Sequence, residues 1–267
     1  MTNLFQTLEG TAARGAEGLM PEARESVAAA LHALQGPDGG FAGLDGKSDP
    51  YYTLFAWLGL RALGAAYDRN RLCSYMAAHR RDANAVDAQC AAFVLACEGH
   101  HPHLPWLKFG TALLRGGTRG VYTAFLLALT LGDVPRWLAR LAWRRQKRMF
   151  EAGAVEHVPT PRLAAGLILA NLAGECGTGI LSVLISRQCA DGGFVSAPRA
   201  LPDLLATAVA RFSIGNQPSA IGGERAATLA FVEACWRTDG LFGASPRAGR
   251  GDAEHTFYGL LALGTCR

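Results

Sequence analysis

The sequence lacks the features that mark exported and membrane proteins. Its seven cysteines include no Cys-x-x-Cys pair, and their odd number and irregular spacing favour free thiols. Residues 1–19 contain no basic segment followed by an apolar one, so we expect no signal peptide. The most apolar long stretch, residues 166–186, is interrupted by Glu175 and several glycines, so we expect no membrane-spanning segment. Together these absences favour a cytoplasmic protein.

The sequence also has little charge bias, with a formal net charge of +4 over 267 residues. Nucleic-acid binders usually carry a denser basic stripe interleaved with aromatics, so we expect no nucleic-acid partner. The nearest candidate is the basic segment 136–148, whose cations recur at helical spacing around Trp137 and Trp143. This segment favours a solvated outer helix, and the alternative is a helix that docks a protein partner or lies on a membrane surface.

Glycine, in contrast, is abundant, and its 32 residues cluster between apolar runs as punctuation of a repeat. The clearest unit has an Asp-Gly-Gly-Phe turn, followed about ten residues later by Asp-x-x-x-Thr and an apolar run. This plan occurs in residues 34–63, returns in residues 187–207 and, with one Gly replaced by Leu, in residues 235–256. Two central units have lost the glycine turn, and a weaker sixth unit begins at Pro159.

The six units share an anchor position, which is Thr in four of them. The anchors are residues 53, 91, 123, 163, 207 and 256. The steps between them fit two helices of about 12 to 15 residues plus turns. We therefore expect about six helix hairpins within a single domain, residues 1–267.

The two helices of each hairpin differ in polarity. The second helices are apolar nearly all round and must be buried on all sides, whereas the first helices are amphipathic. An open solenoid would need a polar terminal cap, but the chain ends on the apolar residues 260–263. The sequence therefore predicts an all-α fold, an α/α toroid with an apolar inner ring, an amphipathic outer ring and an apolar central cavity.

An Asp opens the second helix of four units, where it is a natural N-cap. The four residues are Asp49, Asp87, Asp203 and Asp252. We expect them to mark one mouth of the toroid.

These turns resemble the repeats shared by the protein prenyltransferase β subunits and the squalene- and oxidosqualene-cyclase superfamily. Residues 191–203 and 252–260 resemble most closely the last two repeats of geranylgeranyltransferase β subunits. The likeness covers most of the chain, strongly at residues 28–64 and 185–264. It implies the toroid fold, but fold alone does not fix an activity.

The resemblance implies a zinc site made of an Asp, a Cys two residues later and a His from the next repeat. The Asp and the His correspond to Asp203 and His255, but the Cys position is Leu205, which cannot bind a metal. Asp252 or Glu254 could complete the set. Asp203, His255 and Asp252 are accordingly the candidate catalytic residues, with Asp203 and His255 as candidate zinc ligands. The alternatives are an N-cap role for Asp203 and a structural helix-start role for His255.

The resemblance also implies a cationic group that holds a diphosphate, for which Arg119 is a candidate; Arg162, Arg199 and Arg211 are others. Inner-ring aromatics are the candidate isoprenoid-binding residues, unless they simply fill the barrel. They are Tyr51, Tyr52, Phe55, Trp57, Phe93, Tyr122, Phe125, Phe212, Phe257 and Tyr258.

Three functions are consistent with these residues. The first is a prenyltransferase-like protein that binds an isoprenoid, as a prenyl diphosphate or a terpenoid, and transfers it. The second is a terpenoid cyclase or isomerase, although neither the Asp-x-Asp-Asp acid motif nor an Asp-Asp-x-x-Asp metal motif occurs. The third is a non-catalytic toroid that binds a lipid-like molecule, or a protein partner through its outer helices.

Overall fold

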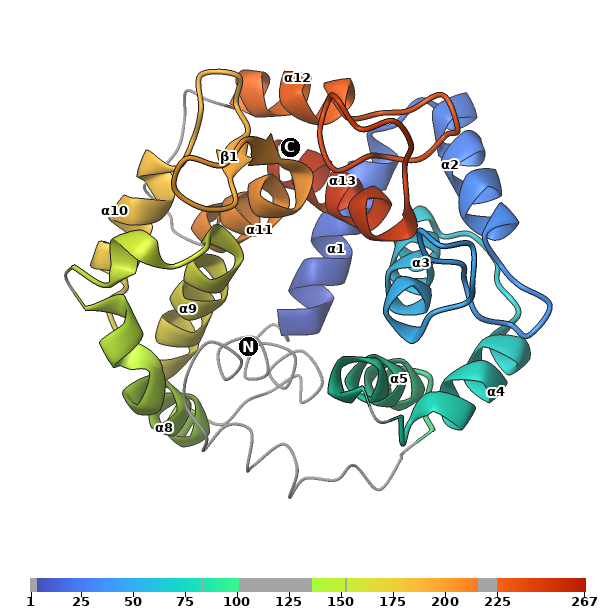
Figure 1. Ribbon diagram of the computed structural model, residues 1–267, viewed down its shortest axis with the longest axis horizontal. Coiled ribbons are helices and arrows are strands. Elements are labelled where there is room, and N and C mark those ends of the chain that lie inside the picture. The colour runs from blue at the N-terminus through green and yellow to red at the C-terminus, as the bar shows by residue number, and fades with distance from the viewer. Residues whose placement is uncertain (1–3, 83, 101–135, 152, 216–224) are drawn as a thin grey trace. The chain divides into compact units, whose positions relative to one another are not determined.

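The computed structural model describes residues 4–82, 84–100, 136–151, 153–215 and 225–267 (Figure 1). The chain divides into two compact units, and each is described by itself. The first comprises residues 1–8, 105–234 and 266, and the second comprises residues 9–104, 235–265 and 267.

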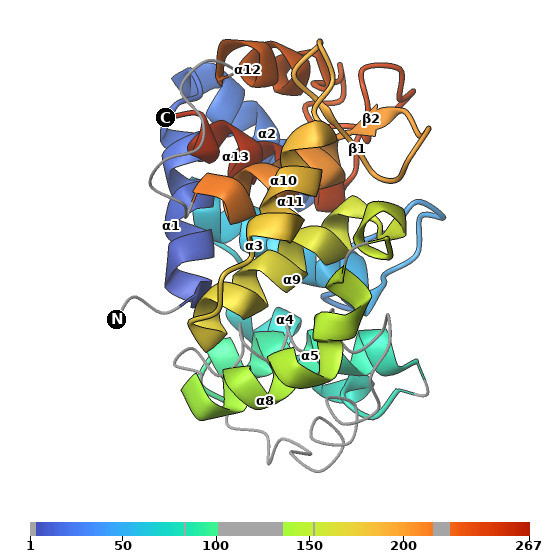
Figure 2. The ribbon, with the colours of Figure 1, turned by 90° about the vertical axis from the view of Figure 1, so that its left-hand side faces the viewer.

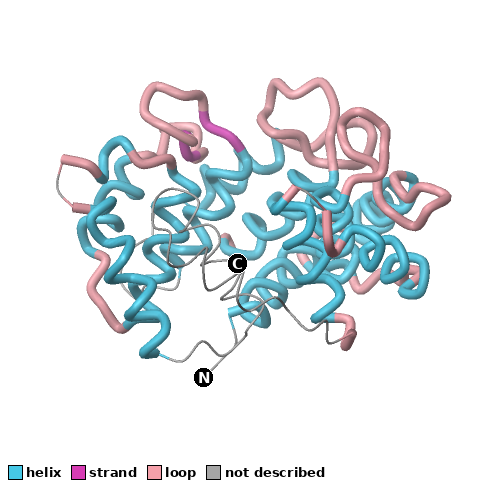
Figure 3. Tube along the Cα trace, turned by 60° about the horizontal axis from the view of Figure 1, so that its bottom comes forward, coloured by secondary structure: helices cyan, strands magenta, loops and turns pink. Residues whose placement is uncertain are grey.

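Helices account for nearly all of the regular structure in both units (Figure 3). The second unit contains most of α1 (Leu4–Glu17), α2 (Pro21–Ala33), α3 (Pro50–Leu63), α4 (Arg69–His79), α5 (Ala85–Cys97) and α13 (Ala253–Thr265). The first contains α8 (Arg136–Gln146), α9 (Thr160–Ala173), α10 (Thr178–Ser186), α11 (Leu204–Gly215), α12 (Arg225–Ala234) and the 3-10 helices η1 (Lys147–Phe150) and η2 (Val155–His157). Its strands β1 (Phe194–Val195) and β2 (Pro202–Asp203) pair antiparallel, with Phe194 opposite Asp203.

The helix order confirms the predicted all-α hairpins. Within the described residues, the helices follow one another in the expected chain order α2–α3, α4–α5, α8–α9, α10–α11 and α12–α13, and the second helix of the pairs α2–α3, α8–α9, α10–α11 and α12–α13 is the more extensively buried one. The hairpin expected around residue 123 lies outside the described residues. Most residues of α3, α9, α11 and α13 are buried, as expected for helices that are apolar nearly all round.

The glycine turns have the same geometry in all three complete repeats. The Asp carboxylate accepts a hydrogen bond of 3.0–3.1 Å from the backbone N–H two residues later. The glycine between them has a φ of 81° to 93°, a conformation that disfavours any other residue. The three turns are Asp38–Gly40, Asp191–Gly193 and Asp239–Leu241.

A buried hydrogen bond joins each turn to the helix that follows it. The backbone N–H of the turn's Phe donates to the hydroxyl of the anchor Thr, at 2.8, 2.9 and 3.1 Å in chain order. Both residues of every pair are at most 1% exposed. Because a buried N–H needs a hydrogen-bond acceptor, the Phe of the turn and the Thr of the helix occur together in the motif. The pairs are Phe41–Thr53, Phe194–Thr207 and Phe242–Thr256.

Three of the four predicted N-caps are confirmed. Asp49, Asp203 and Asp252 each accept a hydrogen bond from a backbone N–H in the first turn of α3, α11 and α13, respectively. The prediction for Asp87 is wrong, because Asn84 caps α5 by accepting from the N–H of Val86. Asp87 lies within the first turn, where its charge is still favourable to the helix dipole.

Each glycine turn lies against the outer helix of the following hairpin. A Cβ atom on Gly39 would lie 2.5 Å from the carbonyl oxygen of Arg71 in α4, and one on Gly192 would overlap the backbone of Ala227 in α12. Gly240, in the last repeat, has this relation to α2, where its Cβ would lie 2.9 Å from the hydroxyl of Ser26. The last repeat is therefore followed in space by the first, as closure requires.

Helix α1, which the repeat does not predict, packs on the apolar end of α13. A Cβ atom on Gly15 would overlap the carbonyl oxygen of Leu260, and one on Gly264 would overlap that of Thr11, so the two backbones are in direct contact. Glu9 also pairs with Arg61 in the last turn of α3, at 2.6 Å. Residues 9–17 thus lie across the C-terminal ends of α3 and α13, and Figure 2 shows α1 next to α13. The apolar end of α13 needs no polar cap because α1 covers it.

This close packing predicts opposite effects for two glycines of α1. Gly10→Ala should leave stability unchanged or raise it by up to about 1 kcal/mol, because its Cβ would meet nothing within 4 Å and alanine favours the helix. Gly15→Ala should cost about 1–3 kcal/mol through steric overlap with α13. Urea unfolding of the two variants measures the difference, and an equal gain for both would contradict the contact.

Candidate functional site

The candidate site lies at the N-terminal ends of α3 and α13, within the second unit. The two helices pack against each other and begin with equivalent segments, residues 49–53 and 252–256. Each segment runs from a capping Asp to the buried anchor Thr. The residues two and three positions after each capping Asp therefore lie at the N-terminal ends of both helices.

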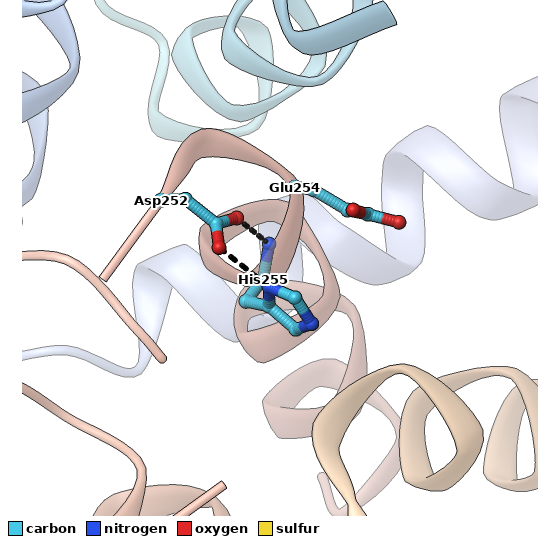
Figure 4. Close-up of side chains that lie close together, drawn as sticks. All are labelled: Asp252, Glu254 and His255. Carbon is cyan, nitrogen blue, oxygen red and sulfur yellow. Dashed lines mark hydrogen bonds and ion pairs between the residues drawn. The ribbon is translucent and has the colours of Figure 1, made fainter. Parts of the chain in front are cut away.

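Asp252 and His255 form a hydrogen-bonded pair in the first turn of α13 (Figure 4). Nδ1 of the imidazole lies 2.7 Å from Oδ2 of the carboxylate, whose Oδ1 accepts from the backbone N–H of His255 at 2.9 Å. Asp252 is 8% exposed, and its two carboxylate oxygens each have a partner in His255. With Nδ1–H donated to Asp252, neutral His255 has Nε2 as its basic atom. This is the arrangement in which a carboxylate orients a histidine for proton transfer.

Glu254 connects α13 to α3. The hydroxyl of Tyr51 donates to Oε1 of Glu254 at 2.5 Å, and the Glu254 carboxylate is also buried. In Figure 4 the Glu254 side chain leaves the turn on another side than His255. Tyr51 and Glu254 each lie two residues after a capping Asp, so equivalent positions of two hairpins form this hydrogen bond.

Tyr52 is surrounded by negative charge. Burial, together with the charges of Asp252, Glu254 and Asp49, raises the pKa of Tyr52 to about 12, and the nearby charge of Arg250 offsets only part of this. The Tyr52 ring lies against Gly43, where a Cβ atom would approach it to 2.9 Å. The N-terminal ends of α3 and α13 are thus acidic, with Arg250 close by.

Aromatic rings pack directly behind the acidic groups. The ring of Phe55 lies 4.9 Å from that of Tyr51, 5.2 Å from Tyr258 and 5.9 Å from Phe257, measured between centroids. All four belong to α3 or α13, and Tyr51 also donates to Glu254, the residue before His255. Of the predicted substrate-binding residues, Tyr52 thus lies near enough to Asp252 to feel its charge, and Phe257 and Tyr258 follow His255 by two and three residues along α13.

Two other predicted substrate-binding residues, Trp57 and Phe93, lie in a different cluster. Their rings meet edge to face at 6.1 Å, and the indole N–H of Trp57 donates to the buried carboxylate of Glu98 at 2.8 Å. Burial raises the pKa of Glu98, but hydrogen bonds from Tyr67, Trp57 and Arg69 outweigh this effect and lower it. This network joins the end of α5 to α3 and α4, which gives Trp57 a structural role in addition to the predicted one.

Of the residues that correspond to the zinc ligands of the resembling enzymes, Asp203 lies in the first unit and His255 in the second, and zinc binding stays a prediction. Asp203 caps α11 in the first unit, with its Oδ1 2.7 Å from the N–H of Ala206, and Leu205 offers no donor atom. A local alternative exists in the second unit, where donor atoms of Asp252, Glu254 and His255 all lie within 4.8 Å of one another. Arg119 and Tyr122, predicted to bind substrate, lie outside the described residues.

Sequence reasoning missed Arg250 and the Tyr51–Glu254 pair. Arg250 donates to the carbonyl of Leu44 and is the cation whose charge reaches Tyr52. In the sequence, only its position two residues before the capping Asp252 indicates that Arg250 lies near the site. Tyr51 and Glu254 could be paired only if α3 and α13 were known to be neighbours.

The acidic surroundings of Tyr52 predict a late titration. In a spectrophotometric titration, the difference between wild type and Tyr52→Phe should show tyrosinate forming near pH 12, because nearby carboxylates and burial disfavour the anion. Asp252→Asn should move this step to lower pH by removing one negative charge. A step near pH 10 in the wild type, the ordinary value for tyrosine, would contradict the described environment.

The comparisons with known proteins agree with this architecture. A family model described as "Prenyltransferase alpha-alpha toroid domain" matches residues 1–147 and 163–267. No curated protein matches the chain significantly. In the part of the chain that the structure describes, no helix is long and apolar enough to cross a membrane. The match covers nearly the whole sequence, and the chain therefore belongs to the prenyltransferase α/α toroid family.

Proposed function

We propose that this chain binds an isoprenoid on the aromatic residues of α3 and α13 and that His255, held by Asp252, is the general base of a prenyl-transfer reaction. The observation that carries the proposal is the order of residues along α13. Asp252 and His255 form a hydrogen-bonded pair, and Phe257 and Tyr258 follow them against Phe55 of α3.

The aromatic cluster suits both parts of an isoprenoid reaction. Contact with apolar rings favours a branched hydrocarbon chain by about 0.8 kcal/mol per buried methylene, before the cost of binding. The faces of aromatic rings also attract a cation, and positive charge develops on the allylic carbon as a prenyl diphosphate ionises. Phe55, Phe257 and Tyr258 would serve both purposes.

The Asp252–His255 pair supplies the proton transfer that prenyl transfer needs. As the bond between the allylic carbon and the diphosphate oxygen breaks, the diphosphate takes the electron pair. The acceptor forms a new bond to that carbon and loses its proton to Nε2 of His255. Asp252 then stabilises the resulting imidazolium. A positioned general base such as His255 typically contributes about 10²- to 10⁴-fold in rate.

One observation favours a second candidate, a terpenoid cyclase or isomerase. Asp49, Asp252 and Glu254 make the mouth of the site acidic, which attracts a carbocation and repels a diphosphate. In addition, Leu205 occupies the position at which the resembling enzymes have a cysteine that binds zinc. In this second reaction His255 would take the proton from a carbocation instead of from an acceptor.

The test compares His255→Gln with His157→Gln, a matched change at an exposed histidine of the first unit. Farnesyl diphosphate is the probe, with and without a peptide that contains one cysteine, and both diphosphate release and organic products are measured. We expect His255→Gln to lower turnover at least 100-fold while farnesyl diphosphate binding changes little. His157→Gln should behave as the wild type.

The products separate the two candidates. Release that requires the peptide, with formation of a prenylated thiol, supports transfer, whereas a hydrocarbon or alcohol formed without the peptide supports cyclisation or isomerisation. Elemental analysis of the same samples shows whether zinc is bound and whether His255→Gln removes it. A protein that binds farnesyl diphosphate but never turns it over would contradict both reactions and leave a lipid-binding role.

A further inference from the structure

Helix α8 has two sharply different faces. Ala139, Ala142, Trp143 and Gln146 are buried, and α8 packs against α9 through this side. Just beyond the helix, the ring of Phe150 stacks on that of Trp143 at 5.6 Å. The packing fixes the orientation of α8 within the first unit, so the residues on the opposite face are defined. Figure 2 shows α8 at the surface turned toward the viewer.

The outward face combines two apolar side chains with a set of cations. Trp137 is 68% exposed and Leu141 is 42% exposed, and the two stand one helical turn apart near the middle of this face. The surrounding exposed residues are Arg136, Arg140, Arg144, Arg145, Lys147 and Arg148. No acidic residue occurs between positions 136 and 150.

Some of these cations are tied to the fold and others are not. Nε of Arg140 donates to the carbonyl of Ala173 at the end of α9, at 3.1 Å. Among the described residues, no carboxylate forms an ion pair with Arg144, Arg145 or Arg148. These three residues are therefore available to an external anion, and replacing them should leave the packing of α8 on α9 intact.

We propose that the outward face of α8 lies on the surface of a membrane that contains anionic phospholipids. Cations attract the lipid head groups, while the indole of Trp137 and the side chain of Leu141 enter the boundary between head groups and acyl chains. A nucleic acid would use the arginines but would not need an exposed Leu141 between them. An acidic protein surface is the remaining alternative, and the experiment distinguishes it. The inference does not depend on the proposed reaction.

The experiment measures sedimentation of the full chain with vesicles of phosphatidylcholine containing 30% phosphatidylserine, and with vesicles of phosphatidylcholine alone. We expect binding to the anionic vesicles that weakens as salt is raised, and much weaker binding to the neutral ones. The triple variant Arg144→Gln, Arg145→Gln, Arg148→Gln should bind about 100-fold more weakly, because each cation near an anionic surface contributes a factor of about five.

A matched triple variant controls for net charge. Arg80→Gln, Arg81→Gln, Arg247→Gln removes the same three charges from exposed positions elsewhere and should bind as the wild type does. Trp137→Ala tests the apolar contribution, and it should both weaken binding and abolish a blue shift of tryptophan emission on vesicle addition. Thermal unfolding of all variants should match the wild type, since every changed side chain is exposed.

Three results would overturn the proposal. The first is no sedimentation with anionic vesicles at low salt, which would leave an acidic protein as the partner of this face. The second is equal loss of binding in the two triple variants, which would show attraction by net charge alone. The third is binding without any change in Trp137 emission together with equal binding to a DNA duplex, which would show a general affinity for polyanions.

Discussion

The hydrogen bond between the turn's Phe and the anchor Thr sets the geometry of the whole repeat. It fixes the glycine turn to the first turn of the following apolar helix, and its donor and acceptor are both buried. An unpaired buried N–H would cost about 1–3 kcal/mol, so the turn and the helix start are coupled energetically. Because the capping Asp lies four residues before this Thr, the three positions between them inherit a fixed orientation in every complete repeat.

The candidate site is a consequence of this fixed orientation together with the contact between first and last repeats. Gly240 places the last turn against α2, and α13 packs beside α3. Equivalent positions at the starts of α3 and α13 are then close together, and they carry different types of side chain. The first hairpin supplies Tyr51 and Tyr52, whereas the last supplies Glu254 and His255. In a structurally uniform repeat, the candidate site thus differs from the equivalent positions of the other repeats by two adjacent residues.

Features set by residues a few positions apart, such as helix caps, could be predicted from the sequence. Contacts between distant helices could be predicted only in part. The caps Asp49, Asp203 and Asp252 follow from residues three or four positions apart, as does the alternation of amphipathic and apolar helices. The assignment of Asp87 failed because Asn84 offers an equally good cap one turn earlier. Helix α1 belongs to no repeat, and its role depends on close backbone contact with α13, which residue types alone do not reveal.

The site itself was predictable to a similar extent. Asp252 and His255 pair within one helical turn, so their proximity follows from spacing. The Tyr51–Glu254 hydrogen bond joins residues 203 positions apart and required knowledge of which helices are neighbours. Trp57 and Phe55 lie on one apolar helix and are indistinguishable by composition, yet one contacts Glu98 and the other the rings of α13. Only the direction of each side chain separates them.

In the proposed function, α3 and α13 together hold an isoprenoid near the Asp252–His255 pair. Photolabelling with a farnesyl diphosphate analogue that carries a diazirine, followed by mass spectrometry of the peptides, tests this directly. We expect labels within residues 50–63 and 253–265, and we expect excess farnesyl diphosphate to suppress both. Labels confined to other helices, or labels that excess farnesyl diphosphate does not suppress, would contradict it.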